Sequence, residues 1–72
     1  MPITTSEEFS QIERWLTVLI TTYEQYPSLA LAKTINYYVQ RLISHEDIML
    51  LPNRKCDYFS MLRYWQWVIK AS

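Results

Sequence analysis

The sequence contains no glycine. Tight β-hairpin turns commonly use glycine, because it adopts positive φ angles without steric cost, so several strands without a single glycine would be unusual. Phosphate-binding loops of the glycine-rich kind are excluded outright. This absence favours a fold made of helices.

Cysteine and histidine occur once each, as Cys56 and His45. One cysteine excludes an internal disulfide, and the two residues fall short of the roughly four ligands of a structural zinc site. Glu46 and Asp47 follow His45 directly, and adjacent residues rarely point to one spot, so we interpret the three as a solvated helix end. The chain offers no serine with a histidine–aspartate relay. We therefore expect no metal, no cofactor and no enzymatic activity.

Net charge is also absent, since seven basic residues balance seven acidic ones. No global charge attracts the chain to nucleic acid or to an anionic membrane. The distribution is uneven, because residues 1–26 carry a net charge of −3 and residues 51–72 a net charge of +3. The two ends should attract each other, either within one molecule or between two antiparallel copies.

Long apolar runs are missing. The longest uncharged stretch near the start, residues 15–23, is far shorter than the roughly 20 residues that cross a bilayer. Glu7 and Glu8 stand where a signal peptide would carry positive charge. We expect no membrane insertion and a cytoplasmic location, with which a lone thiol is compatible.

Prolines divide the chain into three pieces, each of which predicts one helix. In the first piece, apolar residues recur every three or four positions up to Pro27, which indicates one buried helical face. Thr4 or Thr5 is expected to begin this helix, because a glutamate follows each of them three residues later, as in a capping box. The apolar stripe consists of Phe9, Ile12, Leu16, Leu19, Tyr23 and Tyr26, flanked by Trp15 and Ile20. The opposite face, expected in solvent, consists of Ser10, Glu13, Arg14, Thr17, Thr21, Glu24 and Gln25.

A second helix is predicted over about residues 28–44, with Tyr37 and Arg41 adjacent at the edge of its apolar face. The following connection, residues 45–53, allows one short extra helical turn at about residues 46–51, which Pro52 stops. Asn53 is a good N-cap for a third helix. These elements predict an all-α three-helix bundle, a single domain over residues 1–72, in which the first two helices are antiparallel.

The third helix is apolar on two sides. Its main stripe consists of Tyr58, Met61, Leu62, Trp65, Val68 and Ile69. A second arc holds Cys56, Phe59, Arg63 and Trp67. A tryptophan beside an arginine is typical of interface hot spots. Three interpretations stay open for this arc: burial inside the monomer by a central third helix, a homodimer seam, or a site for a foreign protein. The thiol itself is interpreted as inert, because no second cysteine or histidine base accompanies it.

The basic third helix also allows a helix-turn-helix interpretation, in which Arg54, Lys55, Arg63 and Lys70 would contact phosphates. The connection before it is too long for that motif, and the chain has no net positive charge to drive binding. Nucleic-acid binding therefore remains the alternative function.

Half of the residues are hydrophobic and 15% are aromatic, a heavy apolar load for a domain that buries only about 60% of its unfolded surface. We expect another chain to cover part of it. The sequence thus predicts a small non-catalytic protein-interaction module, an adaptor or regulator, that forms a homodimer at micromolar concentration. The candidate protein-binding residues are Trp15, Tyr37, Arg41, Cys56, Phe59, Arg63 and Trp67.

Overall fold

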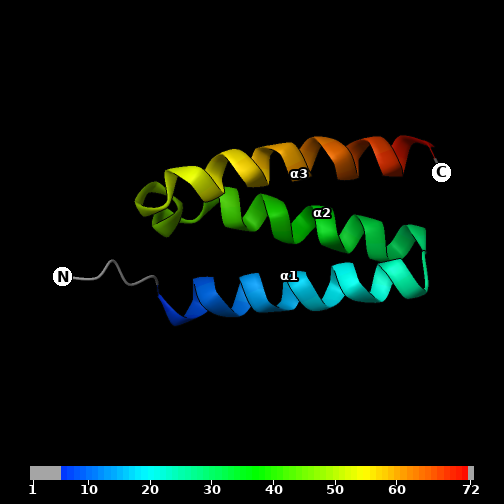
Figure 1. Ribbon diagram of the computed structural model, residues 1–72, viewed down its shortest axis with the longest axis horizontal. Helices are drawn as coiled ribbons and strands as arrows, with labels where there is room; N and C mark the ends of the chain where they lie inside the picture. The colour runs from blue at the N-terminus through cyan, green and yellow to red at the C-terminus, as the bar shows by residue number, and fades with distance from the viewer. Residues whose placement is uncertain (1–5, 72) are drawn as a thin grey trace.

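Three α-helices and one 3-10 helix make up the computed structural model, which describes residues 6–71 and has no β-strand in that range. The elements are α1 (Glu7–Gln25), α2 (Leu29–Ser44), η1 (Glu46–Leu50) and α3 (Pro52–Ala71). Successive helices run antiparallel, with the α1–α2 turn and the end of α3 at one end of the bundle and η1 at the other (Figure 1). The predicted all-α bundle with its short extra turn is confirmed.

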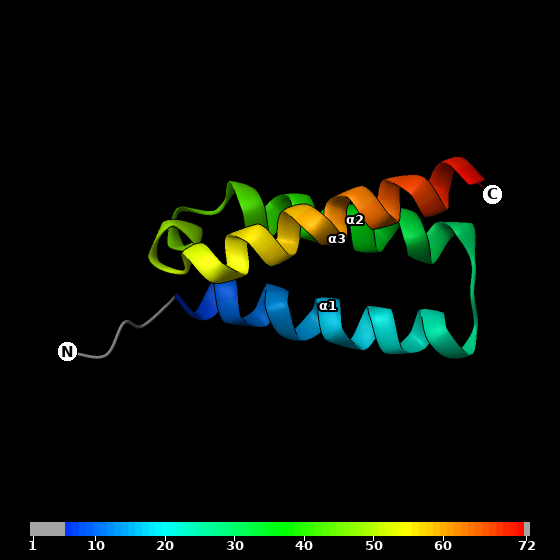
Figure 2. The same ribbon diagram turned by 45° about the horizontal axis from the view of Figure 1, so that its top comes forward.

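The helix with two close neighbours is α2, which packs along both α1 and α3. Helices α1 and α3 meet chiefly through side chains, such as the rings of Tyr23 and Trp65, whose centroids lie 4.9 Å apart edge to face. Figure 2 shows α3 in front of α2, with α1 below them. The interpretation of the third helix as the central one is therefore wrong: it packs with one side of its surface, and the opposite side is left uncovered.

Serine residues cap the first two helices. The Ser6 hydroxyl accepts a hydrogen bond from the Phe9 amide at 3.2 Å, and α1 begins directly after Ser6. The Ser28 hydroxyl accepts from the Leu31 amide at 3.1 Å at the start of α2. The expected start of the first helix is thus corrected to Glu7, and the two threonines proposed as its caps lie outside the described residues. Both serines have extended backbones that direct the hydroxyl to the first turn.

Proline begins α3 instead of ending the turn before it. Pro52 is the first residue of the helix, and the Lys55 amide bonds to the Leu51 carbonyl at 3.0 Å. The first helical position suits proline, since no intrahelical partner exists there for an amide and its fixed φ is already helical. The expectation that Asn53 caps the helix is therefore wrong.

The core lies where the apolar stripes meet, and η1 closes one end of it. The buried residues are Phe9, Ile12 and Leu16 of α1, Ala32, Ile35, Val39 and Leu42 of α2, Ile48 of η1 and Trp65 of α3. The rest of the third helix's main stripe packs, partly buried, against this cluster. One predicted stripe residue, Tyr26, is exposed, because the helix ends at Gln25 and Tyr26 has left helical geometry.

Candidate functional site

The outer side of α3 carries large apolar side chains in solvent. Trp67 is 65% exposed and Phe59 45% exposed, and Cys56 and Arg63 are exposed as well. These four predicted residues form one arc on the side of the helix opposite Trp65, and we call them the α3 outer face. Burial inside the monomer is thus wrong for this arc. Its position follows from α3 packing with one side only.

An aromatic contact ties the α3 outer face to the core. Tyr64, itself exposed, lies with its ring 6.4 Å from the Trp67 ring and 5.1 Å from the buried Trp65 ring. The Trp65–Tyr64 pair is edge to face, a favourable arrangement of two rings. The Trp67 ring therefore lies against a neighbour that contacts the core. This contact lowers the conformational entropy that the Trp67 side chain would lose when a partner binds it.

A second exposed apolar surface lies between α1 and α2. Trp15 is 50% and Tyr37 52% exposed. The Trp15 and Tyr38 rings lie 6.3 Å apart, and the Tyr38 and Tyr37 rings 5.7 Å apart. A shallow groove of about 180 Å³, lined by Trp15, Val18, Leu19 and Tyr38, runs along this surface. We call it, together with Tyr37, the α1–α2 seam.

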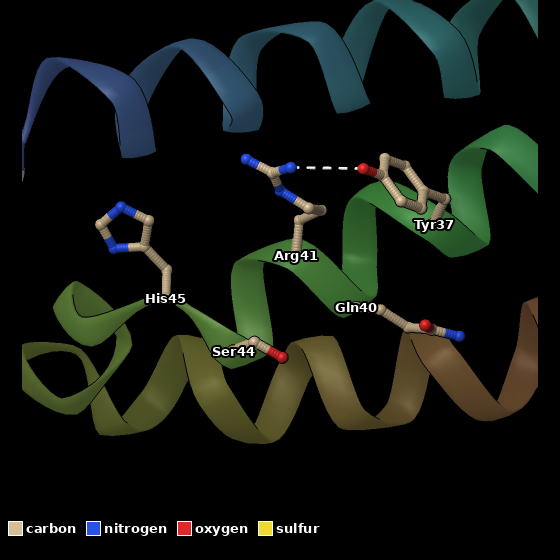
Figure 3. A pocket seen from close by; sticks show the side chains of 5 residues that line it. All are labelled: Tyr37, Gln40, Arg41, Ser44 and His45. Carbon is tan, nitrogen blue, oxygen red and sulfur yellow. Dashed lines mark hydrogen bonds between the residues drawn. The ribbon is translucent and has the colours of Figure 1, made fainter.

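Arg41 closes one end of the α1–α2 seam. Its guanidinium donates to the Tyr37 hydroxyl at 3.2 Å and contacts the Glu8 carboxylate at 3.3 Å. The hydrogen bond from Arg41 to Tyr37 is the main reason that the pKa of Arg41 is raised. Figure 3 shows the two side chains joined on α2, facing α1. The predicted adjacency of Tyr37 and Arg41 is confirmed, and the structure adds Trp15 and Tyr38 to the same surface.

The single histidine has a structural contact. His45 Nδ1 accepts a hydrogen bond from the Asp47 amide at 3.1 Å, which caps η1, and the ring lies edge-on to Phe9 at 5.2 Å. Figure 3 places His45 beside Arg41 at the rim of an open pocket of about 340 Å³, with Gln40 and Ser44 pointing toward α3. Residues 6–71 contain no group of three or more side chains suited to a metal ion. Residues 45–47 lie at a helix end, as predicted, but they are not all solvated, because only 19% of the His45 and Asp47 side chains is exposed.

Asp47 fastens the start of α1 to η1. Its carboxylate accepts a hydrogen bond of 2.5 Å from the Ser6 amide, 41 residues away in sequence. This bond to the backbone is the main cause that lowers the pKa of Asp47. The hydrogen bond stabilises the charged carboxylate of Asp47. Its contribution to the free energy of unfolding is therefore present above the ordinary carboxyl pKa of about 4 and is lost as the pH falls below that value.

We therefore expect Asp47→Asn to lower the melting temperature at neutral pH and to flatten the loss of stability between about pH 5 and pH 2. Asparagine can still accept the Ser6 amide through its carbonyl, so the substitution removes the titratable charge alone. Thermal unfolding followed by circular dichroism across this pH range measures the effect. Glu46→Gln, at an exposed carboxylate of the same short helix, should behave like wild type; an equal change in both variants would contradict the assignment.

Glu13 joins α1 to α3, a contact that the sequence did not reveal. Arg54 Nη1 donates to both Glu13 carboxylate oxygens, at 2.8 and 3.0 Å, and the Tyr58 hydroxyl donates to the same carboxylate. Only 21% of the Glu13 side chain is exposed, so its expected position in solvent is wrong. Burial is the main cause that raises the pKa of Tyr58, and the hydrogen bond to Glu13 raises it further. The acidic and basic ends thus attract within one molecule.

This contact also bears on nucleic-acid binding. Of the four cations in the third piece, Arg54 is held by Glu13, and the Lys55 ammonium lies 3.8 Å from the Met49 sulfur. The connection to α3 contains η1 and is not the short turn of a helix-turn-helix motif. Arg54 is therefore less available to phosphates than the exposed Arg63 and Lys70.

Comparison with known protein families, with curated proteins and with solved structures finds no match to this chain. None of the helices within residues 6–71 has the length and apolar character needed to cross a bilayer.

Proposed function

We propose that this protein is a non-catalytic binding module that offers the α3 outer face to another protein. The observation that carries the proposal is the exposure of Trp67 and Phe59 around Arg63 on one side of a helix whose other side is packed. Hot spots are rich in tryptophan and arginine, because a large rigid ring gains area on desolvation and a guanidinium gives directional bonds.

The partner that fits this face is apolar with acidic groups at its edge. Arg63 lies within the arc, and Lys70 follows Trp67 by three residues, so both cations are available to carboxylates of a bound protein. No acidic residue belongs to the arc itself. The free thiol of Cys56 on this face fits a reducing compartment, and we propose the cytoplasm as the location.

Trp67→Ala should weaken binding of the partner by about 2 kcal/mol or more, the loss typical of a hot-spot tryptophan. Tagged wild-type and variant chains are used as bait in lysate of the native cell, and captured proteins are identified. Gln66→Ala, at the exposed neighbouring position of α3, and Thr17→Ala on α1 serve as controls. A partner retained equally by all four chains would place its binding site elsewhere.

The alternative proposal, a nucleic-acid-binding regulator, rests on exposed Arg63 and Lys70 beside aromatic rings. The dependence of binding on salt concentration distinguishes the two proposals. Binding to nucleic acid should weaken steeply between about 50 and 200 mM salt because counterions are released from phosphates, whereas an apolar protein contact should change little. The measurement is titration of a labelled duplex and of the captured protein at both salt concentrations.

A further inference from the structure

Two threonine hydroxyls beside the α1–α2 seam are already paired within their own helices. Thr22 follows Val18 by one turn of α1, and its hydroxyl donates to the Val18 carbonyl at 2.8 Å. Thr34 precedes Tyr38 by one turn of α2, and its hydroxyl donates to the Ala30 carbonyl at 2.9 Å. Because an unpaired buried donor is costly, these two threonines can lose their water at low cost when a partner covers the seam.

Opposite charges are paired at one end of this surface, whereas Lys33, one turn before Tyr37 on α2, is exposed farther along it. Glu8 of α1 and Arg41 of α2 lie 3.3 Å apart, so they stand at the same level along the bundle. Trp15 and Tyr38 likewise stand at one level, since their rings are in contact. The acidic helix α1 and the basic helix α2 lie side by side, and each contributes one of these rings. Two copies of this surface are complementary when α1 of one copy faces α2 of the other.

We infer that a second copy of this chain binds the α1–α2 seam about a twofold axis parallel to the helices. This inference goes beyond the proposed function: it takes up the homodimer that the sequence predicts and names its surface. The axis places α1 of each copy beside α2 of the other, so the four helices form an antiparallel bundle. Each Glu8 then faces Arg41 of the second copy, and each Trp15 faces Tyr38 of the second copy.

The α3 outer face is less suited to a second copy. Arg63 lies at the middle of the arc, and α3 carries four cations against the single carboxylate Asp57. Two such helices brought together would place like charges close to one another, which opposes association. Helices α1 and α2 together carry four carboxylates against three cations, so they have no such excess. The second copy is therefore placed on the seam, and the acidic partner on the α3 outer face.

The seam is small for an interface between two proteins. The shorter helix has 16 residues, hence a length of about 24 Å, and two packed helices are about 20 Å wide. The surface therefore measures roughly 500 Å² per copy, or about 1,000 Å² in total, at the lower limit of specific interfaces. A dimer with a dissociation constant in the micromolar range is expected.

Sedimentation equilibrium of the full chain between about 1 and 500 µM tests the inference. Trp15→Glu should weaken the dimer at least about 30-fold, because it places an unpaired charge in the interface. Met49→Glu, a change of an exposed apolar residue on η1, outside the seam as defined, should dimerise like wild type. Circular dichroism shows whether each variant is folded.

A charge exchange makes the test independent of any fault in folding. Glu8→Arg alone and Arg41→Glu alone should each weaken self-association, because like charges then face each other across the axis. An equimolar mixture of the two variants should restore dimers to near wild-type affinity, because the introduced charges are opposite. A structural defect in either variant would not be repaired by mixing.

Three results would overturn the inference. They are a wild-type chain that stays monomeric at the highest concentration, a Trp15→Glu variant that dimerises like wild type, or dimers lost with Trp67→Glu alone, which would place the second copy on α3. Loss of a captured protein with Trp15→Glu, in a monomeric wild type, would assign the seam to a foreign partner. Because Trp67→Ala tests the proposed function through a different protein, the two failures are distinguishable.

Discussion

Replacing Phe9 by alanine should lower the free energy of unfolding by about 3–5 kcal/mol. Phe9 is 0% exposed, and its ring meets the ring of His45 edge-on in the closed end of the bundle. A chain of 72 residues has a total stability of roughly 4–11 kcal/mol, at about 0.05–0.15 kcal/mol per residue. The substitution therefore removes a large part of what holds the fold, and the melting temperature should fall by more than about 12 °C.

Phe59→Ala is the matched control, since it deletes the same side chain from a site that is 45% exposed. Phe59→Ala should lower the free energy of unfolding by less than about 1 kcal/mol, as substitutions away from the core do. Urea unfolding followed by circular dichroism measures both variants, at a concentration where the chain is monomeric. Equal losses would mean that Phe59, and with it the α3 outer face, is buried in the folded molecule.

The helices were predictable because each apolar stripe repeats at helical spacing over many residues. The main stripe predicted for α3 lies on the packed side of that helix, because its members all pack in or against the core. The ends were less certain, because several residues near each end can cap. Ser6 and Pro52 have the chemistry of helix starts, but so do Thr5 and Asn53, and the residue types alone do not select between them.

The sequence predicted which residues form the candidate site, but only part of how they are arranged in space. Trp67 and Arg63 were correctly placed on one arc, because that arc follows from the spacing alone. Trp15 was placed beside its stripe, but its contact with Tyr38 depends on how α1 and α2 are rotated against each other. Glu13 was missed because a wheel with one apolar stripe assumes one neighbour, whereas α1 also meets α3.

The two apolar surfaces do not compete for space. Helix α3 packs against α2 and reaches α1 through Trp65 and Arg54, so it occupies one groove of the α1–α2 pair. The α1–α2 seam is the groove on the other side, and the α3 outer face points away from both helices. A dimer formed through the seam would leave two copies of the α3 outer face free, and a dimeric or repeated partner would then gain in avidity.

Glu13→Ala should lower the free energy of unfolding by about 1–3 kcal/mol, because the half-buried Tyr58 hydroxyl loses its acceptor. Arg54 contributes little of this loss, since 53% of its side chain is exposed and water screens the ion pair. The measurement is urea unfolding at neutral pH. Glu24→Ala, at an exposed glutamate near the other end of α1, should change stability by less than about 0.5 kcal/mol.

The tyrosine gives this prediction a second, independent signature at alkaline pH. The folded state raises the pKa of Tyr58, so the unfolded chain ionises first and stability falls as the pH rises above the ordinary tyrosine pKa of about 10. Tyr58→Phe removes this contribution, and its stability should fall less steeply there than that of wild type. It should also abolish most of the loss caused by Glu13→Ala, because the hydroxyl left unpaired by that change is gone. Additive losses in the double variant would show that the Glu13 carboxylate acts on α3 through Arg54 alone.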